Sequence, residues 1–236
     1  MDKPQLFLFH FAGGNRYSFQ FIAPLLTDFE VIPLELPGRG RRMDESLLTR
    51  FEAAAKDIYH QVSQRVNGNN VVLYGHSLGA YIAFKICGLL ENDGIFPTSL
   101  VVSGNPGPGA KEMKNRHLME QEEFIKELKM LGGVPEEFLN EPELFSLFEP
   151  ILRADFELAE KNGLENEAPV KAPLFAMMGE QEEGIEKIAN WGRFSSSRFD
   201  HELLEGDHFF IYKHPQRIAD IIRYCYQKAK PIQQEI

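Results

Sequence analysis

Short apolar runs alternate with helix-like patterns along most of the chain. The strand-like runs cover residues 5–10, 30–34, 71–74, 99–103, 174–178 and 198–204. Residues 51–66 instead carry apolar side chains at three- and four-residue steps, which predicts an amphipathic helix with one buried face. Further helices are predicted at 18–26, from 80 onwards and around 218–225. Strands that alternate with helices favour one α/β domain over residues 1–236, with a mostly parallel sheet covered on both faces.

The stretch from about 111 to 167 interrupts this alternation. It has no strand-like run, only short helical patterns rich in Glu, Leu and Phe, with two apolar stripes: Leu118, Phe124, Ile125, Leu128 and Leu131, then Leu144, Phe145, Leu147, Phe148, Ile151 and Leu152. We expect a helical lid inserted above the carboxyl ends of the strands, where open α/β sheets bind their ligands. Part of the stripes would form a small core, and the rest would suit an acyl-chain site.

A possible nucleophile follows the third apolar run. Gly75-His76-Ser77-Leu78-Gly79 stands directly between the strand-like run 71–74 and the helix-like run that starts at Ala80. Strand, Gly-x-Ser-x-Gly and helix together are typical of the nucleophile elbow, a turn so tight that only glycines fit beside the serine. The alternative is an ordinary strand-to-helix turn with a capping serine. The context favours Ser77 as a nucleophile at a helix N-terminus.

A nucleophilic serine needs a base and an acid, and in α/β-hydrolases these follow it in the order acid, then histidine. His208 is the candidate base because it comes late, after a strand and a glycine; a loop histidine braced by Asp207 or Glu205 is the alternative. The acid is expected in the loop after the 174–178 strand, which also reads as a plain solvated turn. That loop offers Glu180, Glu182 and Glu183.

The loop after the first strand is the expected second half of an oxyanion hole. Phe11-Ala12-Gly13-Gly14 places small residues where backbone N–H groups must face a substrate carbonyl. We assign the donors as the N–H groups of Phe11 and Leu78, with Ala12 as the competitor for the first. His10 is expected to brace this loop. A plain glycine turn is the alternative.

These residues carry a resemblance to the type II thioesterases associated with nonribosomal peptide and polyketide synthases, over nearly the whole chain. The segments that resemble the family are Phe11-Ala12-Gly13-Gly14, Pro37-Gly38-Arg39-Gly40, the elbow, Leu131-Gly132-Gly133-Val134-Pro135-Glu136, Arg153-Ala154-Asp155-Phe156 and Gly206-Asp207-His208-Phe209-Phe210. The family pattern Gly-x-x-Asp becomes Gly179-x-x-Glu182 here, followed by Ile185 and Trp191. The resemblance therefore implies Glu182 as the acid, with a longer side chain that must fold back by about one methylene.

The resemblance implies the α/β-hydrolase fold and hydrolysis of acyl or aminoacyl thioesters on the phosphopantetheine arm of carrier domains. Ser77 would attack, His208 would take its proton and Glu182 would hold the imidazole. No metal or cofactor is implied beyond the phosphopantetheine that the substrate carries. Two alternatives remain: a general carboxylesterase or acyl-CoA thioesterase, and a non-catalytic member that only binds carrier domains.

The charge balance narrows the partners. With 25 Lys+Arg against 35 Asp+Glu the net charge is −10, which opposes binding to nucleic acid or anionic membranes. We expect a cytoplasmic monomer, because no signal-like or membrane-length apolar run occurs and two cysteines suit a reducing compartment. Docking of an acidic carrier would need a local basic patch. The densest positive clusters are Arg39, Arg41 and Arg42, with Lys111, Lys114 and Arg116.

Overall fold

A computed structural model describes residues 3–110, 112–134 and 136–229 of the chain. Within these residues six strands form one sheet in the order β2-β1-β3-β4-β5-β6, and every neighbouring pair is parallel. The strands are β1 (Gln5–Phe9), β2 (Glu30–Pro33), β3 (Val71–His76), β4 (Ser99–Ser103), β5 (Leu174–Gly179) and β6 (Phe199–Leu204). Each one lies within a predicted strand-like run or extends it by one or two residues. The parallel α/β prediction is confirmed.

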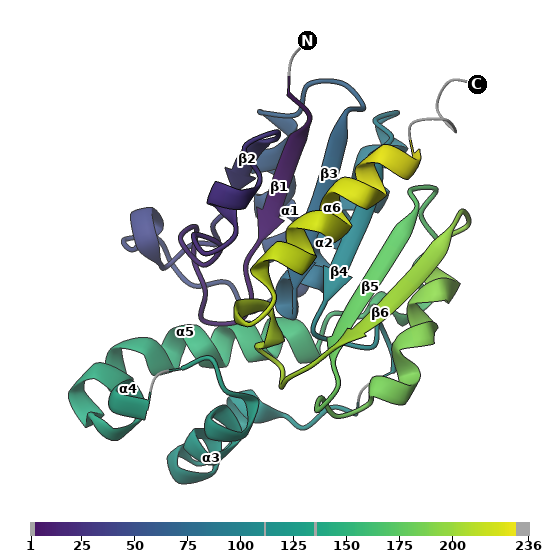
Figure 1. Ribbon diagram of the computed structural model, residues 1–236. Coiled ribbons are helices and arrows are strands. Elements are labelled where there is room, and N and C mark those ends of the chain that lie inside the picture. The colour runs from purple at the N-terminus through teal and green to yellow at the C-terminus, as the bar shows by residue number, and fades with distance from the viewer. Residues whose placement is uncertain (1–2, 111, 135, 230–236) are drawn as a thin grey trace.

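Helices cover both faces of this sheet (Figure 1). They are α1 (Phe51–Ser63), α2 (Leu78–Asn92), α3 (Gln121–Leu131), α4 (Glu136–Asn140), α5 (Pro142–Glu160) and α6 (Pro215–Ala229). In Figure 1 α6 lies across one face, whereas α1 and α2 lie behind the strands on the other. A ten-residue 3₁₀ segment, Ile185–Phe194, follows β5. The sequence patterns gave no expectation of it.

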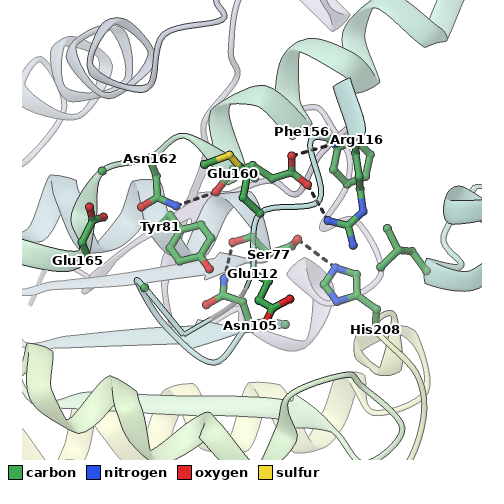
Figure 2. A pocket seen from close by; sticks show the side chains of 16 residues that line it. Ser77, Tyr81, Asn105, Glu112, Arg116, Phe156, Glu160, Asn162, Glu165 and His208 are labelled. Atoms are coloured by element: carbon green, nitrogen blue, oxygen red, sulfur yellow. Dashed lines mark hydrogen bonds and ion pairs between the residues drawn. The ribbon is translucent and has the colours of Figure 1, made fainter. Parts of the chain in front are cut away.

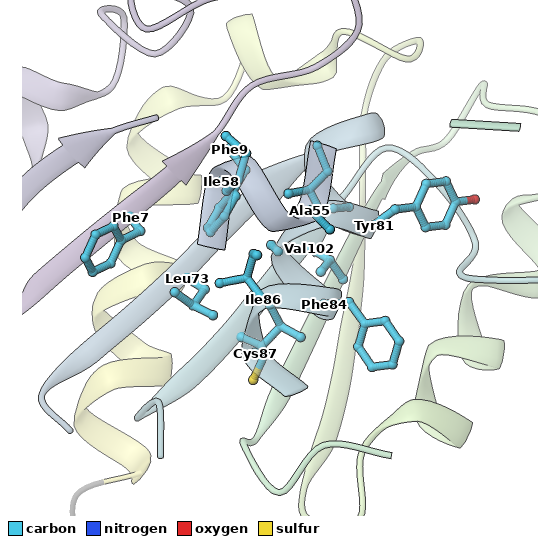
Figure 3. Close-up of a cluster of buried hydrophobic side chains, with 14 of the residues drawn as sticks. Phe7, Phe9, Ala55, Ile58, Leu73, Tyr81, Phe84, Ile86, Cys87 and Val102 are labelled. Atoms are coloured by element: carbon cyan, nitrogen blue, oxygen red, sulfur yellow. The ribbon is translucent and has the colours of Figure 1, made fainter. Parts of the chain in front are cut away.

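Strand periodicity divides the apolar side chains between two cores. Phe7 and Phe9 of β1 pack with α1 and α2 (Figure 3), whereas Leu6 and Leu8 pack on the opposite face with α6. Successive strand residues point to opposite faces, and both faces of a parallel sheet are covered. The central strands are therefore apolar at nearly every position, which is why they read as continuous hydrophobic runs.

The prediction of a helix over residues 18–26 is wrong. These residues form consecutive turns, with one 3₁₀ helix at Ala23–Leu25. Pro24 lies inside the predicted range, and a proline cannot donate the backbone hydrogen bond that a longer helix needs there. The turns still bury Phe19, Ile22 and Leu26 against the α6 face of the sheet, so the apolar spacing reflected burial without a helix.

Apart from an isolated bridge at Val170, the described regular elements between β4 and β5 are all helical, and they make up the segment predicted as a lid. Figure 1 shows α5 crossing beneath the carboxyl ends of the strands, with α3 and α4 beside it. The lid has its own small core of Phe124, Leu128, Leu139, Phe145 and Leu152. Other members of the predicted stripes stay exposed, including Leu118 at 72% and Leu147 at 70%. The helical periodicity was therefore right, but it placed too many residues on the buried side.

In the part of the chain that the structure describes, none of the helices combines the length and apolarity needed to cross a membrane. Cys87 and Cys225 are both buried and free, as expected for small apolar side chains on α2 and α6. Burial raises the pKa of both thiols, so they stay protonated and unreactive at neutral pH.

Candidate active site

Ser77 lies between the last residue of β3 and the first residue of α2, in a strained backbone conformation. Its φ of 56° and ψ of −116° are disfavoured for a residue with a side chain. Two hydrogen bonds hold it there. The Ser77 N–H donates to the Ser103 carbonyl at 2.7 Å, and the Asn105 side-chain amide donates to the Ser77 carbonyl at 2.8 Å. Both partners lie at the end of β4, next to the elbow.

The glycines of the elbow are required by close backbone contacts. A Cβ on Gly75 would lie 2.0 Å from the carbonyl oxygen of Gly79, and a Cβ on Gly79 would lie 2.0 Å from that of Phe9. Neither distance is compatible with any side chain. These contacts let α2 begin directly against the ends of β1 and β3. The predicted turn is confirmed, and its tightness comes from this packing.

The structure brings Ser77, His208 and Glu182 into one chain of hydrogen bonds. His208 follows β6, and its Nε2 lies 3.0 Å from Ser77 Oγ (Figure 2). Its Nδ1 lies 2.6 Å from Glu182 Oε2. A carboxylate accepts, so the imidazole proton belongs on Nδ1, and Nε2 accepts from the serine hydroxyl. His208 and Glu182 are both buried, at 9% and 8% exposure, which shields the contacts from water.

Glu182 is the one of the three candidate glutamates that reaches His208. The turn after β5 is closed by the Glu182 N–H, which donates to the Gly179 carbonyl at 3.0 Å. The side chain folds back over this turn, and its Oε1 accepts from the Gly179 N–H at 2.8 Å. Glu180 is exposed, and Glu183 pairs with Lys114 at 3.0 Å. The fold-back accommodates the extra methylene of glutamate.

The loop after β1 forms a β-turn over Phe11–Gly14. The Gly14 N–H donates to the Phe11 carbonyl at 2.9 Å, and Gly13, the third residue, has φ of 75°, a conformation that favours glycine at this position. Leu78 opens α2, where the first N–H groups have no partner within the helix. The N–H groups of Phe11 and Leu78 thus belong to the two segments that flank Ser77. Their role as oxyanion donors stays a prediction, as does that of Ala12.

His10 braces the Phe11 loop from beneath, as expected. The Leu36 N–H donates to its Nε2 at 3.3 Å, and its Nδ1 donates to the Phe11 carbonyl at 2.9 Å. Burial, and then the charge of Arg39, lower the pKa of His10 from 6.5 to about 4. The imidazole is therefore neutral at neutral pH, which is the form that can accept at one nitrogen and donate at the other.

A cavity of about 280 Å³ opens at Ser77 (Figure 2). Its lining is mixed: Tyr81, Leu131 and Phe156 are apolar or aromatic, whereas Asn105, Glu160 and Arg116 are polar or charged. Figure 2 shows Ser77 and His208 side by side at its wall, beneath residues of the lid. Burial raises the pKa of Tyr81, so its phenol stays neutral. The cavity therefore presents both apolar and polar side chains beside the serine.

A second cavity, of about 260 Å³, is lined by Phe11 and residues of the lid. Its lining is almost entirely apolar: Phe11, Ala12, Gly13, Gly133, Val134, Phe138, Phe145, Phe148, Leu152 and Phe209. Four of the ten come from predicted lid helices, α4 and α5. Some Phe and Leu residues of the lid therefore form its core, and Phe138 and Phe148 line this cavity. Its use as an acyl-chain site stays a prediction.

The predicted basic surface is mostly neutralised by carboxylates. Arg39 is only 4% exposed and pairs with Asp155. Arg42 contacts Glu45 and Asp57, each at 2.6 Å, and Arg116 is buried against Glu127 and Glu160. Lys114 also pairs with glutamates, Arg41 is exposed, and Lys111 lies outside the described residues. Arg39 and Arg116 therefore do not belong to an open positive patch, which corrects that expectation.

Metal-binding clusters are not found among the described residues. No group of three or more His, Cys, Asp or Glu side chains there is arranged to hold an ion. Ser77 and His208 line the first cavity, and Glu182 contacts His208. The parallel sheet, the strained serine after β3 and the histidine after β6 define the class of this protein as the α/β-hydrolase fold.

Comparison with known proteins narrows this class. A family model described as "Thioesterase domain" matches residues 4–225, and the chain belongs to this family. Linear gramicidin dehydrogenase LgrE of Brevibacillus parabrevis is 31% identical over 230 residues, which are 94% of this chain and 87% of LgrE. The probable anguibactin biosynthesis thioesterase AngT of Vibrio anguillarum is 29% identical over 232 residues, covering 94% of this chain and 91% of AngT.

A solved structure agrees with this assignment. RedJ, a thioesterase from the prodiginine biosynthetic pathway in Streptomyces coelicolor, superposes with a TM-score of 0.86 at 26% identity, covering 95% of this chain and 90% of RedJ. The chain is therefore an enzyme that hydrolyses thioesters. The remaining questions are which groups perform the hydrolysis and what carries the acyl group.

Proposed function

We propose that this thioesterase removes acyl or aminoacyl groups from the phosphopantetheine arm of carrier domains in a nonribosomal peptide or polyketide synthase, and so clears stalled or wrongly loaded carriers. The observation that carries the proposal is the Ser77–His208–Glu182 chain of hydrogen bonds at the wall of the 280 Å³ cavity. A solved type II thioesterase from the yersiniabactin NRPS/PKS biosynthetic pathway, YbtT, is 27% identical to this chain and supports the choice of carrier. The protein would act in the cytoplasm, as a monomer, without a metal or soluble cofactor.

The proposed mechanism assigns each side chain one task. Ser77 Oγ attacks the thioester carbonyl carbon while His208 Nε2 takes the hydroxyl proton, and Glu182 holds the imidazolium through Nδ1. The N–H groups of Phe11 and Leu78 donate to the oxyanion. Collapse breaks the C–S bond, and His208 returns the proton to the departing thiolate. His208 then activates water, which releases the acid and restores Ser77.

The mixed lining of the cavity favours a compact acyl group with polar substituents. Asn105, Asn162 and Glu160 offer hydrogen-bond partners near Ser77, whereas Tyr81 and Phe156 offer apolar contact. A cavity with this mixed lining can orient a small acyl group by its polar atoms and exclude water with its apolar side chains. An aminoacyl group has both characters.

Arg41 is the remaining candidate for contact with an acidic carrier. It is exposed and lies two residues after the buried Arg39, at the basic turn after β2. Arg42 beside it already binds two carboxylates, so its free charge is smaller. Because the whole protein is acidic, with a net charge of −10, a local positive group would favour docking of an acidic domain.

Three other functions are tested against this one. A general esterase or acyl-CoA thioesterase would prefer free esters or acyl-CoA to carrier-bound groups. A non-catalytic carrier-binding protein would hydrolyse neither. The name of LgrE also raises hydride transfer, but the sequence has no Gly-x-Gly-x-x-Gly run of the kind that binds dinucleotides, and we do not propose it.

The test is turnover on a panel of acyl- and aminoacyl-carrier substrates, with nitrophenyl esters and acyl-CoA for comparison. Wild type should hydrolyse carrier-bound groups with the highest kcat/KM, and Ser77→Ala should remove both this activity and labelling by a fluorophosphonate. Equal rates on nitrophenyl esters would favour the esterase. A Ser77→Ala variant that keeps its activity would contradict the mechanism.

A further inference from the structure

A buried ion pair joins the lid to the core beside the candidate site. Arg39, in the turn after β2, and Asp155, on α5, are 4% and 0% exposed. The guanidinium contacts both carboxylate oxygens: Nη1 binds Oδ2, and Nη2 donates to Oδ1 at 2.9 Å. Such a two-point contact fixes the plane of the carboxylate. The orientation of Asp155 is therefore set by Arg39.

The same carboxylate binds the loop after β1. Asp155 Oδ2 accepts a hydrogen bond from the Gly13 N–H at 2.8 Å. Leu152, one turn earlier on the same face of α5, also packs on this glycine, since a Cβ built there would lie 2.6 Å from Leu152 Cδ2. The lid helix thus contacts Gly13 with one polar and one apolar side chain.

The Phe11–Gly14 turn is consequently held from two sides. His10 and the Gly14 N–H both donate to the Phe11 carbonyl, whereas Asp155 holds the Gly13 N–H from the lid side. The positive φ of Gly13 depends on how the peptide between Ala12 and Gly13 is turned. The carboxylate accepts from the N–H of that peptide and so favours one of its two orientations.

We infer that Asp155, oriented by Arg39, is a positioning residue for thioester hydrolysis. By holding the Gly13 N–H, it fixes the turn that presents the Phe11 N–H to the developing oxyanion. The inference rests on the proposed function, because it needs the Phe11 loop to be half of the oxyanion hole. Loss of one oxyanion donor lowers kcat about 10²–10³-fold in enzymes of this kind. A misplaced loop should approach the lower figure.

Stability alone gives a different expectation. A buried ion pair replaced by apolar side chains of similar size is often neutral or stabilising, whereas removing one partner leaves a buried charge. Variants that remove both charges therefore separate positioning from folding. R39M/D155L removes the pair and the acceptor for Gly13. R39M/D155N removes the same charges but keeps an amide oxygen that can accept from the Gly13 N–H.

The experiment measures kcat, KM and Tm for both double variants on one acyl-carrier substrate. We expect the kcat of R39M/D155L to fall about 10²-fold, with KM within threefold of wild type. The kcat of R39M/D155N should stay at least tenfold higher than that of R39M/D155L. Affinity for a boronic acid that forms a tetrahedral adduct with Ser77 should fall in parallel with kcat. The exposed pair Arg217 and Glu202, removed as R217M/E202L, is the matched control and should leave kcat unaltered.

The outcomes separate the two proposals. Equal kcat in the two Arg39/Asp155 double variants, with Tm values within a few degrees, would overturn the positioning role while Ser77→Ala still abolishes activity. A parallel loss of kcat and of Tm in both double variants would also overturn the positioning role, since this result would show that the ion pair is purely structural. Activity that survives in Ser77→Ala would instead overturn the proposed function.

Discussion

The neutral state of His10 predicts a specific acid sensitivity of folding. The imidazole is buried at 3% exposure, with Arg39 nearby, and its pKa is lowered from 6.5 to about 4. The folded protein therefore excludes a proton that the unfolded chain binds below about pH 6.5. Stability from this group is fully present above pH 6.5 and is lost as the pH falls toward 4.

The magnitude follows from the two pKa values. One pKa unit corresponds to about 1.4 kcal/mol, so a change from 6.5 to about 4 corresponds to about 3 kcal/mol of unfolding free energy. Asp155 and Glu35 oppose the shift through their charges but do not reverse it. His10 should add a slope of at most about 1.4 kcal/mol per pH unit between pH 6.5 and 4.

The assay is urea unfolding of wild type and His10→Gln between pH 8 and 4 at constant ionic strength. Glutamine keeps a donor and an acceptor but has no proton to take up, so the free-energy difference between the two proteins should shift by about 3 kcal/mol in favour of the variant on going to low pH. His60→Gln, which replaces an exposed histidine on α1, controls for loss of an imidazole. Parallel curves for wild type and His10→Gln would refute the reasoning.

Three further predictions concern the site and its supports. Glu182→Gln should lower kcat by up to about 10⁴-fold in steady-state assays, whereas Glu180→Gln, on an exposed side chain, should match wild type. Gly79→Ala should destabilise the protein by about 3 kcal/mol in urea unfolding, because the added Cβ meets the backbone at 2.0 Å; Gly88→Ala in the same helix, with its nearest contact at 4.0 Å, should not. Arg41→Glu should slow hydrolysis of carrier-bound groups several-fold through association and leave small thioesters unaffected; an equal effect on both would exclude docking.

Sequence patterns were sufficient for the elements that local rules control. The strands are continuous apolar runs because both faces of a parallel sheet are covered. The elbow could be recognised by its glycines because backbone segments approach too closely there for a side chain. Ser77 and His208 could be placed near each other because both follow strands whose carboxyl ends share one edge. The residues alone left Glu180, Glu182 and Glu183 equivalent. The family pattern Gly179-x-x-Glu182 selected Glu182, and the structure adds the contact that positions it, the hydrogen bond from the Gly179 N–H.

Contacts between distant segments could not be predicted. Arg39 and Asp155 are separated by 116 positions, and each looks like a solvated charge in its own segment. The prediction of an open basic surface failed for the same reason, since carboxylates from other elements neutralise Arg116 and Arg42. Asn105 follows β4 in a segment that carried no site prediction. Its amide in fact holds the Ser77 carbonyl.

The unfavourable backbone angles of Ser77 place selection for stability in conflict with selection for activity. A residue with a side chain at φ of 56° carries a conformational penalty of about 1–3 kcal/mol, and glycine would relieve most of it at the same position. A screen for heat resistance alone should therefore enrich glycine at position 77 and yield variants that are more thermostable but catalytically inactive. Improvement of this enzyme has to be sought elsewhere in the chain, with activity monitored at every round.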